Sequence, residues 1–147
     1  MKRILPPVLF VLCLLAILLL TVWLPIADII DYPLTLLGVG LFVFGLGVSI
    51  AGKRHFSKIG TNIMTFGNPN VLVTDGLFRF SRNPMYLGFS ISVLGAALLS
   101  GVLSSLLVFV VFTFLVDRNY IQYEEKKMID AFGQSYIDYC SKVRRWL

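Results

Sequence analysis

Long apolar runs separated by short polar segments dominate the pattern of this chain. Uncharged stretches cover residues 4–24, 33–52 and 84–116. A transmembrane helix needs about 20 apolar residues, so each of the first two stretches predicts one span. The third is longer and is divided near Gly101, which predicts a tight hairpin of two short helices lying shallow or tilted. We therefore expect about four transmembrane helices, at 4–24, 33–52, 84–99 and 102–116.

Two polar segments alternate with these spans. Residues 53–83 form a loop rich in Gly, Asn, Thr and Pro, and residues 117–147 form a polar tail. Apolar positions in the tail recur with helical spacing as far as Gly133, which is placed to end a helix. A second short helix is expected from Gln134 to Val143.

Composition supports a single membrane domain over residues 1–147. The mean hydropathy of +0.83 and the 57% hydrophobic content are too high for a water-soluble domain of this size. The first apolar run is longer than the core of a typical signal peptide, and no small-residue cleavage site follows it. We expect this run to be retained as a span. The predicted class is therefore an all-α, polytopic membrane protein.

The distribution of charge predicts the orientation. All 13 Lys and Arg residues lie in the N-terminus, in the segment 53–82 or in the tail from Arg118, and the link 27–32 contains none. The positive-inside rule then places both termini in the cytoplasm, with four spans. Topology and anionic lipid account for the net charge of +5, so nucleic acid is not needed as a partner.

Glycines recur at intervals of seven in the second predicted span, at Gly38, Gly45 and Gly52. Seven-residue spacing puts them on one helix face, where small residues allow close packing of helices in lipid. A nucleotide-binding wall is the alternative, but these glycines lie within an apolar span and follow no strand. We expect them to pack against another helix.

The pair Asn83–Pro84 predicts the start of the third span. Asn is favoured at the N-cap and Pro at the first helical position. The free N–H groups of a helix N-terminus suit an anion. Arg79 and Arg82 lie just outside this N-terminus, and Tyr86 lies in its first turn. These residues predict a site for a ligand with a carboxylate. Alternatively the arginines bind lipid phosphates, the interpretation that charge alone favours.

Glu124 and Glu125 form a second polar cluster, shortly beyond the last predicted span. An acidic pair there suits the amino group or the ribose of a ligand. The alternative is a solvated helix face, in which Glu124 pairs with Lys127 and Glu125 has no partner. Two cysteines and one histidine, His55, predict neither a disulfide framework nor a metal site. His55 is expected to be solvated or to face lipid headgroups.

Two motifs resemble the isoprenylcysteine carboxyl methyltransferase family. Its loop-and-helix motif resembles residues 72–88, LVTDGLFRFSRNPMYLG, and its second motif resembles residues 124–143, EEKKMIDAFGQSYIDYCSKV. Phospholipid N-methyltransferases share the broader pattern. The resemblance implies an integral membrane methyltransferase that uses S-adenosylmethionine as methyl donor. A lipophilic or lipid-like molecule would be the acceptor.

The resemblance also implies roles for individual residues. The adenosyl group would lie against the loop and Phe78, and the amino-acid end against the start of the third span and Glu124. Tyr120 and Arg118 are expected to orient the acceptor. The expected cofactor-binding residues are Asn70, Val71, Leu72, Val73, Phe78, Arg82, Asn83, Pro84, Met85, Tyr86, Glu124 and Glu125.

Three positions depart from the family pattern. Asn83 stands where the family has histidine, so this position should not titrate. Phe78 stands where a tyrosine is common, and Tyr120 stands where an arginine is thought to meet a substrate carboxylate. We therefore expect a neutral or amine acceptor, or a carboxylate met by Arg118 from a bent helix. A phospholipid amine N-methyltransferase and a non-enzymatic membrane protein that packs through its glycines are the alternative functions.

Overall fold

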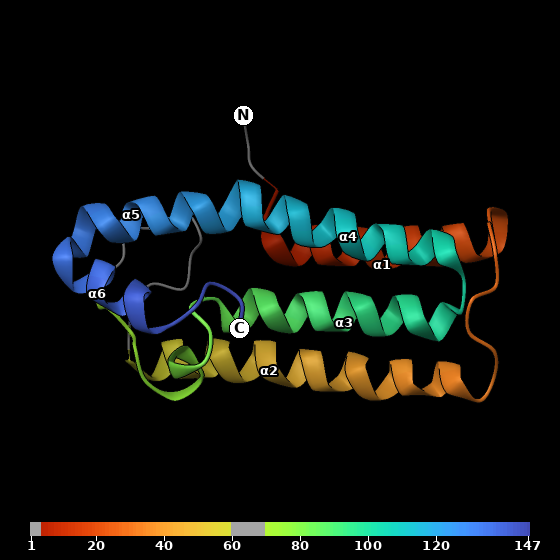
Figure 1. Ribbon diagram of the computed structural model, residues 1–147, viewed down its shortest axis with the longest axis horizontal. Coiled ribbons are helices and arrows are strands. Elements are labelled where there is room, and N and C mark those ends of the chain that lie inside the picture. The colour runs from red at the N-terminus through yellow and green to blue at the C-terminus, as the bar shows by residue number, and fades with distance from the viewer. Residues whose placement is uncertain (1–3, 60–69) are drawn as a thin grey trace.

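The structure is a computed structural model that describes residues 4–59 and 70–147 (Figure 1). Its regular elements within these ranges are helices. In chain order they are α1 (Pro6–Trp23), the 3₁₀ turn η1 (Leu34–Leu36), α2 (Leu37–Ile59), the 3₁₀ turn η2 (Gly76–Arg79), α3 (Pro84–Ser100), α4 (Leu103–Val116), the π-helical turn η3 (Asp117–Ile121), α5 (Gln122–Phe132) and α6 (Gln134–Lys142).

The four long apolar helices form a bundle in which α3 is central. Helix α3 packs against α2 on one side and against α1 and α4 on the other (Figure 1). Side chains from α1, α3, α4 and η3 form one apolar core, in which Val93, Phe112, Val116 and Ile121 have no exposed surface. This core holds the start of α3 against η3, and the predicted site residues flank that junction.

Within residues 4–59 and 70–147, three segments are long and apolar enough to cross a membrane: Pro6–Trp23, Leu34–Lys58 and Leu103–Phe132. Helix α3 has 17 residues and is shorter than a typical span of about 20. Large apolar side chains on α1, α2 and α4 remain exposed, as expected for surfaces that face lipid. The chain is an all-α, polytopic integral membrane protein, as the sequence predicts.

The glycines of α2 pack against α3, which confirms that prediction. A Cβ atom added at Gly38 or Gly45 would collide with the backbone of α3, and one added at Gly52 would collide with Met85. In return, Gly88 and Gly95 of α3 face the backbone of α2. The two helices therefore approach more closely than side chains would permit.

Two predicted boundaries were wrong. The segment expected to be loop from residue 53 begins as helix, because α2 continues to Ile59. Helix α4 continues through η3 into α5 as one helical segment, Leu103–Phe132. In both places a run of charge ends the apolar pattern, but charged side chains do not break a helix. Gly133, with φ of +51°, does end α5, and α6 follows at Gln134 as predicted.

The connection between α1 and α2 contacts the connection between α3 and α4, at the end of the bundle away from the start of α3. Ile29 N donates to the carbonyl of Gly101 at 2.8 Å, and Leu103 N donates to that of Ala27 at 2.9 Å. Lys and Arg are absent from both connections. Within the described ranges, basic residues are therefore confined to the end where α3 begins and where α5 and α6 lie (Figure 1).

Candidate functional site

The N-terminus of α3 is held by polar contacts with the C-terminal segment. Helix α3 starts at Pro84, as predicted, but Asn83 makes no side-chain cap bond. Instead Asn83 Nδ2 donates to the carbonyl of Arg145 at 3.1 Å, and Asn83 N donates to Ser81 Oγ at 3.1 Å. Asn83 therefore occupies the predicted N-cap position, and its carbonyl accepts from Leu87 N at 2.9 Å, but its side-chain amide holds the C-terminal segment and does not cap the helix.

Tyr86 joins the start of α3 to α5. Its hydroxyl donates to Glu124 Oε1 at 2.7 Å, although the two residues are 38 positions apart. Tyr86 is 5% exposed, and its ring stacks on that of Tyr120 with centroids 6.3 Å apart. A hydrogen bond to a carboxylate is a strong one when it is sheltered from water. This hydrogen bond therefore joins the two separate motifs of the sequence.

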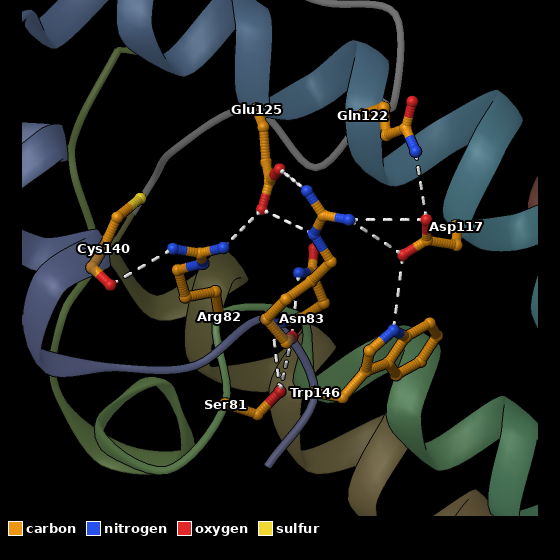
Figure 2. Close-up of polar contacts among 9 residues, drawn as sticks. Ser81, Arg82, Asn83, Asp117, Gln122, Glu125, Cys140 and Trp146 are labelled. Carbon is orange, nitrogen blue, oxygen red and sulfur yellow. Dashed lines mark hydrogen bonds and ion pairs between the residues drawn. The ribbon is translucent and has the colours of Figure 1, made fainter.

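Glu125 pairs with two arginines (Figure 2). Its Oε1 accepts from Arg82 at 2.8 Å, and its two oxygens accept from Arg145 at 3.1 and 2.6 Å. The side chains of Glu125 and Arg82 are only 14% and 12% exposed. The alternative of a solvated helix face, in which Glu125 has no partner, is wrong, since the arginines reach it from distant parts of the chain. Arg82 is held by protein groups rather than free at the surface.

Asp117 completes a charge-balanced cluster. Its carboxylate accepts from Arg145 at 3.3 and 3.4 Å, from Trp146 Nε1 at 3.3 Å and from Gln122 Nε2 at 3.1 Å. Two carboxylates thus face two guanidinium groups. Hydrogen bonding to Glu125, followed by attraction to both carboxylates, raises the pKa of Arg145. Arg82, Asp117, Glu125 and Arg145 are called the charge cluster below; Figure 2 labels the first three.

The loop before α3 lies beside this region and packs toward α2 and α6. Val73 and Phe78 are buried, Leu72 is half-buried, and Asn70 and Val71 are exposed. The ring of Phe78 meets that of Phe56 at 4.9 Å.

The carbonyl of Phe78 accepts a 2.6 Å hydrogen bond from Tyr139 Oη of α6. Burial raises the pKa of Tyr139 to about 12.

His55 is half-buried rather than fully solvated. Its ring lies 6.2 Å from that of Phe78, and its Nε2 is 2.8 Å from Asp75 Oδ1. The hydrogen bond to His55 lowers the pKa of Asp75. In residues 4–59 and 70–147, no group of three His, Cys, Asp or Glu side chains is placed to hold a metal ion.

Tyr120 and Arg118 occupy different surroundings on η3. Tyr120 is buried, and its hydroxyl donates to the carbonyl of Ile4 at 2.6 Å. Arg118 is exposed and lies over the ring of Phe114 at 5.6 Å. The structure brings Tyr120 against Tyr86 and does not bring Arg118 to that contact.

An open hollow of about 440 Å³ lies outside the charge cluster. It is lined by Thr74, Arg79, Ser135, Asp138, Tyr139, Lys142 and Val143. The loop and α6 form its walls, and neither Tyr86 nor Glu124 lines it.

Sequence reasoning missed three residues of the site: Asp117, Arg145 and Trp146. Asp117 directly follows an apolar run, as an ordinary polar boundary would, and Arg145–Trp146 belong to a basic end. No local pattern connects these positions, because their contact depends on the return of the C-terminal segment.

The fold and the site define a polytopic, all-helical membrane protein with a half-buried charge cluster at one end of its bundle. The chain belongs to the phospholipid methyltransferase family, which matches residues 34–135.

Three curated relatives are similar to part of the chain. A protein-S-isoprenylcysteine O-methyltransferase of Schizosaccharomyces pombe is 41% identical over 76 residues, which are 50% of this chain and 31% of the relative. The Saccharomyces cerevisiae protein of the same name is 40% identical over 76 residues, with the same two shares. Protein-S-isoprenylcysteine O-methyltransferase B of Arabidopsis thaliana is 29% identical over 117 residues, 77% of this chain and 56% of the relative.

The matched part of the chain therefore covers only 31% to 56% of the length of these relatives. No solved structure matches it significantly.

Proposed function

We propose that this chain is a membrane methyltransferase that moves a methyl group from S-adenosylmethionine to a lipophilic acceptor. The observation that carries the proposal is the Tyr86–Glu124 hydrogen bond, which unites the two motifs at a buried polar site. Membership of the phospholipid methyltransferase family and the names of the relatives support the reaction class.

The residues at the start of α3 suit the amino-acid end of the donor. Arg82 Nε is buried and, within the described residues, has no hydrogen-bond partner. An unpaired buried donor is costly, and a ligand carboxylate would satisfy it. The carboxylate of Glu124 suits the ammonium group, and the buried face formed by Val73 and Phe78 suits the adenine ring. These residues fit the donor chemically.

Methyl transfer requires positioning more than acid–base chemistry. When bound, the donor supplies an electrophilic methyl on sulfur. The acceptor atom would form a bond to that carbon while the carbon–sulfur bond broke, with its electron pair passing to sulfur. The protein must hold the two in line and exclude water. Stacked Tyr86 and Tyr120 provide a buried, apolar wall for this purpose.

The acceptor is proposed to enter from the bilayer, beside η3. The relatives are named for a prenylated cysteine, which offers a carboxylate, whereas the name of the family points to a phospholipid, which offers an amine. Arg118 is the exposed cation of η3, and it would have to turn to meet a carboxylate. Tyr120 offers no charge, which favours the neutral or amine acceptor.

We also propose that the end carrying the charge cluster faces the cytoplasm, with both chain termini on that side. The confinement of the described basic residues to this end supports the orientation through the positive-inside rule.

Donor binding tests the proposal most directly. The purified protein in detergent should bind S-adenosylhomocysteine in a calorimeter, and Tyr86→Phe should weaken binding. Loss of one hydrogen bond to a charged group costs about 1.5–3 kcal/mol, a loss of roughly tenfold or more in affinity. Glu124→Ala should weaken binding at least as much. Tyr32→Phe, at a side chain 78% exposed at the other end, is the matched control.

Incubation with labelled S-adenosylmethionine and a membrane lipid extract then identifies the acceptor. A wild-type protein that binds no S-adenosylhomocysteine and labels no lipid would refute the proposed function and leave a non-enzymatic role.

A further inference from the structure

The C-terminal segment, residues 143–147, closes over the start of α3. The carbonyl of Arg145 accepts hydrogen bonds from Asn83 Nδ2 at 3.1 Å and from Ser81 Oγ at 3.3 Å. Trp146 packs against the apolar core. The backbone of this segment is therefore fixed to the same helix end that is proposed to hold the methyl donor.

The Arg145 guanidinium bridges two parts of the long helical segment Leu103–Phe132. It donates from Nε and one terminal nitrogen to Glu125 of α5, and from the other terminal nitrogen to Asp117 of η3. Arginine is suited to this role because its planar fork serves two carboxylates at once. A lysine would offer a single point of charge.

The π-helical turn explains how one guanidinium reaches both carboxylates. Asp117 and Glu125 are eight residues apart, and in a regular α-helix such positions point about 80° apart. A π-turn accommodates one additional residue. Residues eight apart across it therefore behave like residues seven apart, which point within about 20° of each other. The turn at Asp117–Ile121 thus aligns the two carboxylates on one face.

Fixing Glu125 also fixes Glu124. The two residues are adjacent on α5, so the rotation of α5 that keeps Glu125 on Arg82 and Arg145 directs Glu124 toward Tyr86. Glu125 uses three hydrogen bonds on the two arginines. The two glutamates therefore have different roles: Glu125 stabilises the contact between α5 and the C-terminal segment, and Glu124 faces the proposed donor site.

We propose that Arg145 and Asp117 are positioning residues for the methyl donor and that the C-terminal segment sets the geometry of Glu124. This inference rests on the proposed function. It gives the basic end of the chain a specific role, distinct from attraction to anionic lipid. Neither residue is required to touch the donor.

Four variants test this role, with affinity for S-adenosylhomocysteine measured by calorimetry. Arg145→Ala should raise Kd roughly tenfold or more, and Arg145→Lys should recover part of the loss because it keeps the charge without the fork. Asp117→Asn should raise Kd by a smaller factor. Arg144→Ala, at the exposed neighbouring arginine, should match the wild type.

A kinetic measurement separates positioning from general damage. With labelled donor and lipid extract, Arg145→Ala should raise the KM for the donor while the rate at saturating donor changes less. A thermal midpoint within a few degrees of the wild type would show that the fold is retained. If Arg145→Ala does not fold, Asp117→Asn carries the test by the same criterion.

Equal Kd values for Arg145→Ala and Arg144→Ala would overturn the inference, as would a fall in the saturated rate at unchanged donor Kd. Both outcomes presuppose a wild-type protein that binds S-adenosylhomocysteine. Absence of wild-type binding instead refutes the proposed function, so the two failures are distinguishable.

Discussion

The contact between α2 and α3 offers a matched pair of alanine substitutions in one helix. A Cβ atom at Gly45 would lie 2.5 Å from the carbonyl oxygen of Gly88 and 2.6 Å from Ser92 N. Both atoms belong to the backbone of α3 and cannot turn aside. A Cβ atom at Gly47 would meet nothing within 4 Å. Gly45→Ala should therefore force the helices apart, whereas Gly47→Ala should not.

The difference between the variants isolates the packing effect. Each substitution gains up to about 1 kcal/mol of helix propensity, and this gain cancels in the comparison. Overpacking of a closely packed interface costs about 1–3 kcal/mol. Gly45→Ala should accordingly be about 1–3 kcal/mol less stable than Gly47→Ala.

Unfolding in mixed detergent micelles, followed by circular dichroism as the denaturing detergent is increased, measures both free energies. A second pair extends the test, because Gly38 contacts the backbone of α3 and Gly40 has open space. Equal stability of Gly45→Ala and Gly47→Ala would refute close packing as the reason for the seven-residue glycine spacing.

Three further outcomes are expected. With the two native cysteines replaced, Asp28→Cys should react with an impermeant thiol reagent added outside intact cells, and Ser57→Cys should not. The reverse labelling pattern would contradict the proposed orientation. Tyr120→Arg should increase methylation of a carboxylate acceptor and decrease methylation of an amine. If the unaltered protein methylates a prenylcysteine analogue, and Arg118→Ala does not change that activity, our assignment of Tyr120 and Arg118 to the acceptor side would be contradicted. Burial raises the pKa of Tyr139 to about 12 from an ordinary value near 10, so the unfolded chain loses this proton at a lower pH than the folded protein. The free energy of unfolding should therefore fall as the pH rises from 10 to 12, and Tyr139→Phe should make that fall smaller.

The membrane class and the two motifs were predictable from sequence, because they depend on local properties. Apolar length predicts a span through the cost of burying charge in lipid, and α1 and α3 begin within two residues of the predicted positions. Gly133 ends α5 because its positive φ is a local preference of glycine. The helix boundaries at residues 53 and 117 were mispredicted, since charge marks the edge of the membrane and does not mark the end of a helix.

Within the candidate site, the sequence indicated Tyr86 and the pair Glu124–Glu125, but it did not indicate which glutamate contacts Tyr86. Two adjacent glutamates are chemically alike, and a local pattern gives Glu125 no partner. Arg82 and Arg145 reach Glu125 from positions 43 and 20 residues away. Asp117 joins them because η3 changes the helical register, and hydrophobic spacing does not predict a π-turn.

The sequence by itself determined that this protein is helical, lies in a membrane and carries the motifs of a methyltransferase family, because hydrophobic length, glycine spacing and short motifs are written along the chain. The tertiary structure decided which charges meet. Only the return of the C-terminal segment over α3 places Arg145 between Asp117 and Glu125. Such contacts depend on where the bundle brings distant segments, because a charge removed from water needs an oppositely charged partner and only the fold determines which one lies near it.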